Sequence, residues 1–177
     1  MEKIKTMSDK INDIVIPKFD IDKLVNYVIH RAPQFGIHGL QHSKNLELNG
    51  LLLANHYTTV NKSVVRAFAY LHDCCRMCDG HDPQHGKRAA MVIDKIRNSI
   101  LGELSDVEIS KLKLACSLHT EIHSSGLIDV DVCVDADRLD LVRCGIMPDP
   151  ERMATKKGAF YAMNMNLLKT LRNEILL

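Results

Sequence analysis

The sequence lacks the signals of several common classes of protein. Its 177 residues include only 5 prolines and 9 glycines. They contain neither a glycine-rich phosphate loop nor alternating strands and helices, so nucleotide-binding folds built on parallel sheets are not expected. Long apolar runs are missing too, since the run at 51–54 is far too short to cross a bilayer. The first 15 residues mix charged with single apolar residues, which is not the pattern of a secretory signal.

An excess of charge is also missing. The net charge is +1 and the pI is near 7.7, which gives no global reason to expect a nucleic-acid polymer or a membrane as partner. With 46% hydrophobic and 25% charged residues, the composition is that of a globular protein with a buried core. The length predicts one domain over 1–177, with its core at about 20–155 and residues 1–18 loosely attached. Six cysteines without a secretory signal predict reduced thiols in a cytoplasmic protein.

The apolar residues recur mostly at helical spacing, which predicts an all-α fold: a compact bundle of about six or seven helices. Asp82 followed by Pro83 is typical of a helix start, and Ser105 with Glu108 forms the pattern of a capping box. The apolar alternation at 130–134, taken alone, would also fit a strand. The predicted helices are 20–32, 40–56, 63–73, 82–101, 105–122, 130–143 and 157–175.

Histidines are numerous, with nine in the chain, and two groups of them lie at helix ends. His72 and Asp73 follow the apolar helix 63–73, where a buried imidazole beside a carboxylate is unfavourable unless something pairs with it. Both side chains could converge on an ion just beyond the helix, or His72 could interact with the helix dipole while Asp73 begins a turn. His38 and His42 open the helix at 40–56, where solvent-facing histidines are the alternative.

Acidic residues interrupt an otherwise apolar helix at 130–143. Asp137 and Asp140 are three residues apart and share a face, whereas Asp135 is turned away from them. Carboxylates in such a setting need a cation, which is either a metal ion or an arginine such as Arg138.

Taken together, two histidines and two aspartates from three helices predict a metal site made by His42, His72, Asp73 and Asp137. Mixed nitrogen and oxygen ligands favour one divalent ion of Mn, Fe, Co, Ni or Mg over a structural zinc ion, which prefers thiolates. Such an ion lowers the pKa of a bound water and makes it a nucleophile near neutral pH.

The order of these motifs resembles the H…HD…D signature of the HD-domain metal-dependent phosphohydrolase superfamily, over residues 36 to about 155. HGLQHS, LHD and DADRLD look like its ligand motifs, and DGHDPQHGKRAA resembles a small stand-alone bacterial subgroup. The resemblance implies that His42 and Asp137 are the first and last ligands. It also implies hydrolysis of a phosphate ester or anhydride, in a nucleotide or related small phosphorylated molecule, by attack of metal-bound water.

One position departs from the best-known relatives. Hydrolases of (p)ppGpp and the helical deoxynucleotidases often carry an acid three residues after the HD aspartate, where this chain has Arg76. This difference argues against borrowing their substrates. A guanidinium fork suits phosphate oxygens, so Arg76 is predicted to act in catalysis by gripping the phosphate.

Further residues are candidates around this site. His85 and His119 match positions that supply extra histidines in the binuclear branches that cleave cyclic dinucleotides. They could hold a second metal, bind phosphate or protonate the leaving group, or they could be ordinary capping histidines. Adjacent histidines of the binuclear branches are missing, so one ion is expected. Arg88 and Arg138 join Arg76 as predicted phosphate ligands, unless they are solvated or paired with acids.

Cys74, Cys75 and Cys78 suggest zinc or redox chemistry, but no second cysteine pair follows at zinc-finger spacing, which favours a structural role. Two other functions remain as alternatives to the hydrolase. One is a non-catalytic sensor module of the HD fold that binds a nucleotide or a metal, and the other is a helical interaction protein.

Overall fold

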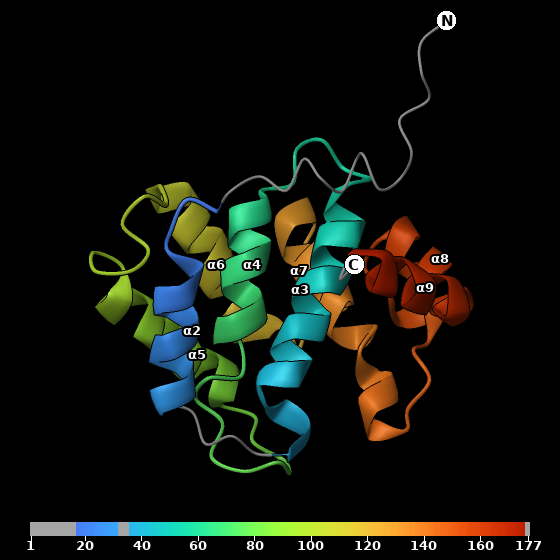
Figure 1. The fold of residues 1–177 in the computed structure, drawn as a ribbon, viewed down its shortest axis with the longest axis horizontal. Helices are drawn as coiled ribbons and strands as arrows, with labels where there is room; N and C mark the ends of the chain where they lie inside the picture. The colour runs from blue at the N-terminus through green and yellow to red at the C-terminus, as the bar shows by residue number, and fades with distance from the viewer. Residues whose placement is uncertain (1–16, 32–35, 176–177) are drawn as a thin grey trace, which may run out of the picture.

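The computed structural model describes residues 17–31 and 36–175, and this part of the chain forms a bundle of helices without strands (Figure 1). The predicted all-α fold is therefore confirmed. The prediction for residues 1–18 lies almost wholly outside the described residues. None of the described helices is long and apolar enough to cross a membrane. The α-helices are α2 (Ile21–Arg31), α3 (Leu40–Ala54), α4 (Lys62–Leu71), α5 (His85–Ile96), α6 (Asp106–Leu118), α7 (Ile128–Arg138), α8 (Lys156–Met163) and α9 (Met165–Ile175).

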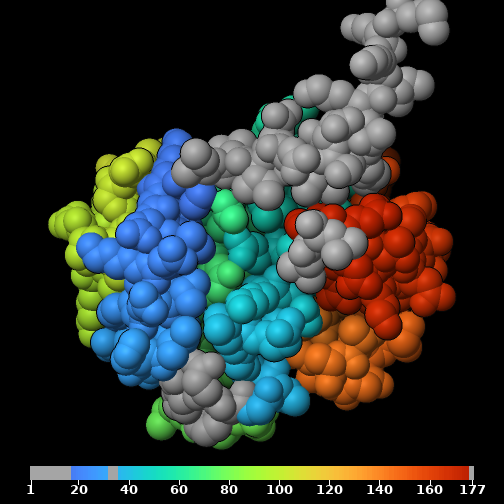
Figure 2. All heavy atoms as spheres, in the orientation of Figure 1, coloured from blue at the N-terminus to red at the C-terminus, as the bar shows by residue number. Residues whose placement is uncertain are grey.

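Helix α4 is the centre of the bundle, as its apolar sequence predicts. It packs against α2, α3, α6 and α7, and most of its residues are buried. It begins at Asn61, whose side chain accepts hydrogen bonds from the N–H groups of Ser63 and Val64, the usual role of an N-cap residue. On the face shown in Figure 2, α4 exposes only a strip of surface between α2 and α3.

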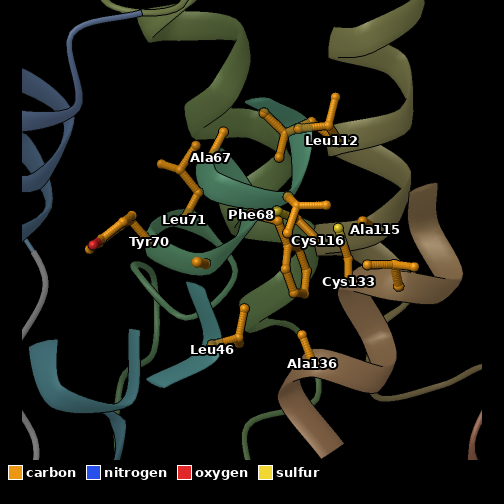
Figure 3. Packing of buried hydrophobic residues seen from close by; sticks show 14 of the residues in the cluster. Leu46, Ala67, Phe68, Tyr70, Leu71, Leu112, Ala115, Cys116, Cys133 and Ala136 are labelled. Carbon is orange, nitrogen blue, oxygen red and sulfur yellow. The ribbon is translucent and has the colours of Figure 1, made fainter. Parts of the chain in front are cut away.

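Phe68, on α4, is at the middle of the core. Its ring is fully buried and lies among side chains from α6 and α7 (Figure 3). The same ring stacks on His72 at a centroid distance of 5.0 Å and meets the edge of His119 at 5.9 Å. The apolar core therefore continues directly into a cluster of histidines. The neighbours labelled around Phe68 include Leu46, Leu112, Ala115, Cys116, Cys133 and Ala136.

The predicted start of helix α5 at Asp82 is wrong. The helix begins at His85 after Gln84, which makes no side-chain capping bond. The Asp82 carboxylate instead accepts hydrogen bonds from the backbone N–H of Met77 at 2.9 Å and from Arg88 at 2.5 Å. An N-cap side chain accepts from the first backbone N–H groups of its helix, whereas the Asp82 carboxylate accepts from the Met77 N–H and the Arg88 side chain.

The capping box of α6 is confirmed. The Ser105 hydroxyl accepts from the N–H of Glu108, and the Glu108 carboxylate accepts from the N–H of Ser105 at 2.7 Å. The same carboxylate accepts from Lys18 at 2.8 Å and from Asn61. Glu108 thereby ties the start of α6 to the segment before α2 and to the start of α4.

The C-terminal end differs from prediction in two boundaries. The single helix expected at 157–175 is divided at Asn164 into α8 and α9, which gives eight α-helices in the described part. The helix expected at 130–143 ends at Arg138, and a 3-10 turn follows at Leu141–Cys144. Gly145 then takes a positive φ of 75°, a conformation that glycine adopts readily. In Figure 1, α8 and α9 lie at the end of the bundle opposite α2.

Candidate metal centre

The four predicted ligands meet at one point. His42 comes from the first turn of α3, His72 and Asp73 directly follow α4, and Asp137 is in the last turn of α7. The Nε2 atom of His42 lies 3.1 Å from Nε2 of His72 and 3.2 Å from Oδ1 of Asp137. The Nε2 atom of His72 lies 3.3 Å from Oδ2 of Asp73. Both histidines are buried, while the Asp137 side chain is 18% exposed and connects the cluster to solvent.

The end of α4 explains how two successive side chains converge. His72 is the C-cap residue of that helix, and its Nδ1–H donates back to the carbonyl of Phe68 at 3.2 Å. This contact and the stacking on Phe68 fix the imidazole with Nε2 pointing beyond the helix end. The chain turns directly afterwards, so Asp73 presents its carboxylate to the same space.

Asp73 also faces a second pair of histidines. Its Oδ1 atom lies 3.0 Å from Nε2 of His85 and 3.9 Å from Nε2 of His119. These two Nε2 atoms are 2.9 Å apart. The Asp73 carboxylate therefore lies between two groups of nitrogens, with Oδ2 toward His42 and His72 and Oδ1 toward His85 and His119.

Close contact between α5 and α6 makes the second group possible. Gly86 follows His85, and a Cβ atom added there would lie 2.1 Å from the carbonyl oxygen of Cys116 and 3.3 Å from the ring of His119. No side chain larger than hydrogen fits at Gly86 without a shift of the α6 backbone. The glycine thus sets the distance between the helices that carry His85 and His119.

All four imidazoles are held in the same manner. Each donates Nδ1–H to an oxygen that can only accept, and each turns Nε2 toward the centre, where His42 Nε2 faces His72 Nε2 and His85 Nε2 faces His119 Nε2. Outer hydrogen bonds of this kind orient the histidines of metal sites. Two lone pairs at such short range need a proton or a metal ion between them. The acceptors of His42, His72, His85 and His119 are, in order, Asp140 Oδ2 at 2.8 Å, Phe68 O at 3.2 Å, Asp82 O at 2.5 Å and Cys116 O at 2.8 Å.

The pKa values of these groups also indicate that the cluster favours a positive charge. Burial alone would lower the pKa of His42, but hydrogen bonds with Asp137 and Asp140 raise it to about 9. Burial would raise the pKa of Asp73, yet the neighbouring histidines hold it well below its usual range. For Asp137, too, the histidines outweigh burial and lower the pKa. Burial lowers the pKa of His119 to about 4, which keeps that ring neutral at pH 7. The carboxylates are thus ionised, and the cluster stabilises a cation.

The donor set fits a divalent metal ion. In the described part of the chain, three overlapping groups of side chains have ligand atoms close enough to hold one: His42 with His72 and Asp73, His72 with His119 and Asp137, and Asp73 with His85 and His119. All donors are imidazole nitrogens and carboxylate oxygens, a set that suits octahedral ions. The described cysteines join none of these groups.

The three arginines predicted to bind phosphate lie in different places. Arg76 is next to the cluster, with Nη1 3.4 Å from Oδ1 of Asp73. Arg88 donates to the carbonyl of Cys75 at 2.9 Å and to Asp82, so it holds the segment between α4 and α5. Arg88 therefore contacts the segment that leads into α5, and its phosphate-binding role stays a prediction.

The Arg138 guanidinium is hydrogen-bonded to backbone carbonyls. Its guanidinium donates to the carbonyls of Ile122, His123 at 3.0 Å and Arg152 at 2.7 Å. The ion pair with Asp135 is long, at 3.9 Å. Arg138 therefore joins two loops to the end of α7, and its phosphate-binding role also stays a prediction.

The sequence did not predict the groups that accept the Nδ1–H bonds of the candidate histidine ligands. Asp140 accepts the Nδ1–H of His42, and its i+3 spacing from Asp137 was the signal that placed both on one face. The backbone carbonyls of Phe68, Asp82 and Cys116 have no signal in the sequence, because any residue type supplies a carbonyl.

Comparison with known proteins yields no relative, because no protein-family model, curated protein or solved structure matches the chain. The likeness to the HD-domain family therefore rests on the sequence motifs alone.

Proposed function

We propose that this protein is a metal-dependent phosphohydrolase of the HD-domain type, which cleaves a phosphate ester or anhydride in a nucleotide or related small molecule. One observation carries the proposal: four oriented Nε2 atoms and the Asp73 and Asp137 carboxylates converge beside a fixed arginine. The balanced net charge favours a small substrate over a nucleic-acid polymer.

The resident ion belongs with His42, His72, Asp73 and Asp137, and the donor set favours Mn, Fe, Co, Ni or Mg. When bound, such an ion supplies a water of lowered pKa and neutralises negative charge that develops on the phosphate. The protein's contribution is to fix the ligands. Asp140 and the Phe68 carbonyl hold the two imidazoles, so little rearrangement accompanies the reaction.

Hydrolysis forms a bond from a water oxygen to phosphorus and breaks the bond from phosphorus to the leaving oxygen. The water gives up one proton, and the leaving oxygen takes one up. His85 is the better of the two extra histidines for the second transfer. Burial lowers its pKa, but hydrogen bonds with Asp73 and the Asp82 carbonyl outweigh burial and raise it. Arg76, beside His85, is in reach to bind the phosphate and offset its charge.

Loss of a ligand tests the proposal directly. Protein purified without a histidine tag would be stripped with a chelator, reloaded with Mn²⁺, and assayed against a panel of nucleotides and simple phosphoesters. The D73N variant should lose the bound ion, and turnover should fall at least about a thousandfold, since both depend on the same carboxylate. The matched control is D94N, because Asp94 is an exposed partner of Lys113 far along α5 from the cluster.

Two results would contradict the hydrolase. Full activity in D73N would show that the cluster does not carry the chemistry. Saturable nucleotide binding without turnover, with several metals loaded in turn, would instead support the sensor module. Arg76 at the position of a catalytic acid is the observation that keeps this second function in view.

A further inference from the structure

Arg76 is held in place from two sides. On one side, its Nη2 donates to the carbonyl of Gly80 at 2.7 Å and its Nε donates to the carbonyl of Cys78 at 3.2 Å. On the other side, Nη1 lies 3.3 Å from Nε2 of His85 and 3.4 Å from Oδ1 of Asp73. The side chain is 11% exposed. Because backbone carbonyls anchor the guanidinium, its position does not depend on attraction to Asp73 alone.

The atoms that Nη1 approaches are ligand atoms of the second group. Asp73 Oδ1 and His85 Nε2, together with His119, form one of the three sets that could hold an ion. A metal ion bound by these atoms would be a second cation close to the guanidinium, whose Nη1 lies 3.4 Å and 3.3 Å from the two ring nitrogens of His85. An arginine keeps its positive charge at every physiological pH. The charge beside the second set is therefore permanent, and it opposes any further cation there.

In the described part of the chain, no arginine contacts the Nε2 atoms of the first group of ligands, His42 and His72. The Nε2 atoms of His42 and His72 lie near each other and near the carboxylates of Asp73 and Asp137, and His119 is within reach of His72 and Asp137 as well. Arg143 and Arg172 pair with Asp140, which is the acceptor for the Nδ1–H of His42. The two groups of ligands thus differ in their surroundings, because the Arg76 guanidinium contacts Asp73 and His85 of the second group.

From this difference we infer that Arg76 takes the place of a second metal ion, so that the centre binds one ion and offers a guanidinium as its second positive charge. The inference rests on the proposed metal centre and adds its stoichiometry and its selectivity. A phosphate held between the ion and Arg76 would contact two cations. The metal ion can exchange with solvent, whereas the guanidinium is a permanent part of the chain. Two positive charges favour a terminal phosphate, which has three non-bridging oxygens, over a diester, which has two and a smaller negative charge.

Counting bound ions tests the inference without any substrate. Tag-free protein would be stripped, reloaded with Mn²⁺ and analysed for metal per chain, with electron paramagnetic resonance to detect coupling between two ions that share a carboxylate. The wild type should bind one ion and show no coupling. R76Q removes the charge and should bind two coupled ions. R76M, which keeps an apolar stem of similar length, should give the same result, and it serves as the second variant if R76Q fails to fold.

Three controls locate the effect. R76K retains a positive charge and should stay at one ion. R88Q removes a charge from the same segment, but Arg88 contacts Cys75 and Asp82 rather than the second set, so it should also stay at one. The double variant R76Q/H85Q should return from two ions to one, because His85 is a ligand of the added ion.

The outcomes separate the two proposals. Two ions in the wild type, or one ion in both R76Q and R76M, would overturn the role of Arg76 and leave the metal centre standing. No bound ion in the wild type would overturn the metal centre itself. A second ion in R76Q that survives the loss of His85 would place it elsewhere and would also overturn the inference.

Discussion

Asp140 accepts the Nδ1–H of His42 at 2.8 Å, across 98 positions of sequence. The same carboxylate accepts from Asn45 at 3.1 Å and pairs with Arg143 and Arg172. It is almost fully buried, and these donors supply its oxygens with hydrogen-bond partners there. Asp140 thus fixes both the tautomer and the direction of the first ligand of the centre.

The first prediction concerns this contact. D140N should weaken Mn²⁺ binding by about tenfold or more, because the amide is a poorer acceptor for the imidazole N–H and leaves His42 less basic. Isothermal titration of stripped protein would measure the affinity. D131N is the matched control, since Asp131 is equally buried but accepts from Ser124 and Ser125. An equal loss of affinity in both variants would assign the effect to general loosening of the fold.

The second prediction is a pH dependence of stability. Burial alone would raise the pKa of Glu108, but Lys18 and Ser105 lower it to about 2, below the usual value of about 4.3. The carboxylate therefore stabilises the folded state above pH 4.5, and this contribution is lost as the pH falls toward 2. E108Q should be less stable at pH 7 by about 1 kcal/mol and should lose less stability on acidification.

Urea unfolding at pH 7, 5 and 3 would check that difference. E103Q is the control, because Glu103 is exposed on the loop just before the same helix. If the wild type and E108Q lose stability in parallel between pH 5 and 3, Glu108 does not contribute to the acid sensitivity.

The third prediction concerns the contact between α5 and α6. G86A should lower the free energy of unfolding by about 1–3 kcal/mol, because the added methyl group would meet the Cys116 carbonyl and force the helices apart. Gly102 provides the comparison: a Cβ atom there meets its nearest neighbour, the carbonyl of Asn98, at 3.5 Å, so G102A should be near neutral. Thermal and urea unfolding would measure both variants, and equal stability of the two would contradict the close contact.

The fourth prediction concerns Asp135, the acid turned away from the centre. It accepts the N–H groups of Ala154 at 2.7 Å and Thr155 at 2.8 Å, so it fixes the start of α8 against α7. D135N should lower the free energy of unfolding by about 1–3 kcal/mol, since an amide nitrogen would then face one of these donors in a buried site. Metal content should remain at the wild-type value. A loss of bound metal in D135N would show that Asp135 belongs to the centre.

The helices could be predicted because the spacing of apolar residues is read directly from the sequence. The convergence of His72 with Asp137 could be predicted because ionisable residues inside apolar segments indicate a shared partner. The sequence did not predict the start of α5, since Asp82 is a good N-cap by type and only the fold reveals that Met77 and Arg88 take its carboxylate. The direction of Arg76 was hidden for a similar reason. It depends on the carbonyls of Cys78 and Gly80, which any residue type would offer.

Arg172, on the last helix, pairs with Asp140 at 3.4 Å, while the ligands begin at His42 on α3. Affinity for the proposed ion would consequently depend on contacts between segments far apart in the sequence, and the site would be complete only after α9 has been synthesised and has docked. A chain still in synthesis would offer scattered imidazoles and carboxylates, which bind ions weakly and with little preference among them. In the proposed centre, loading of the metal would thereby follow the docking of α9, and a bound ion would mark the molecules in which that helix is in place.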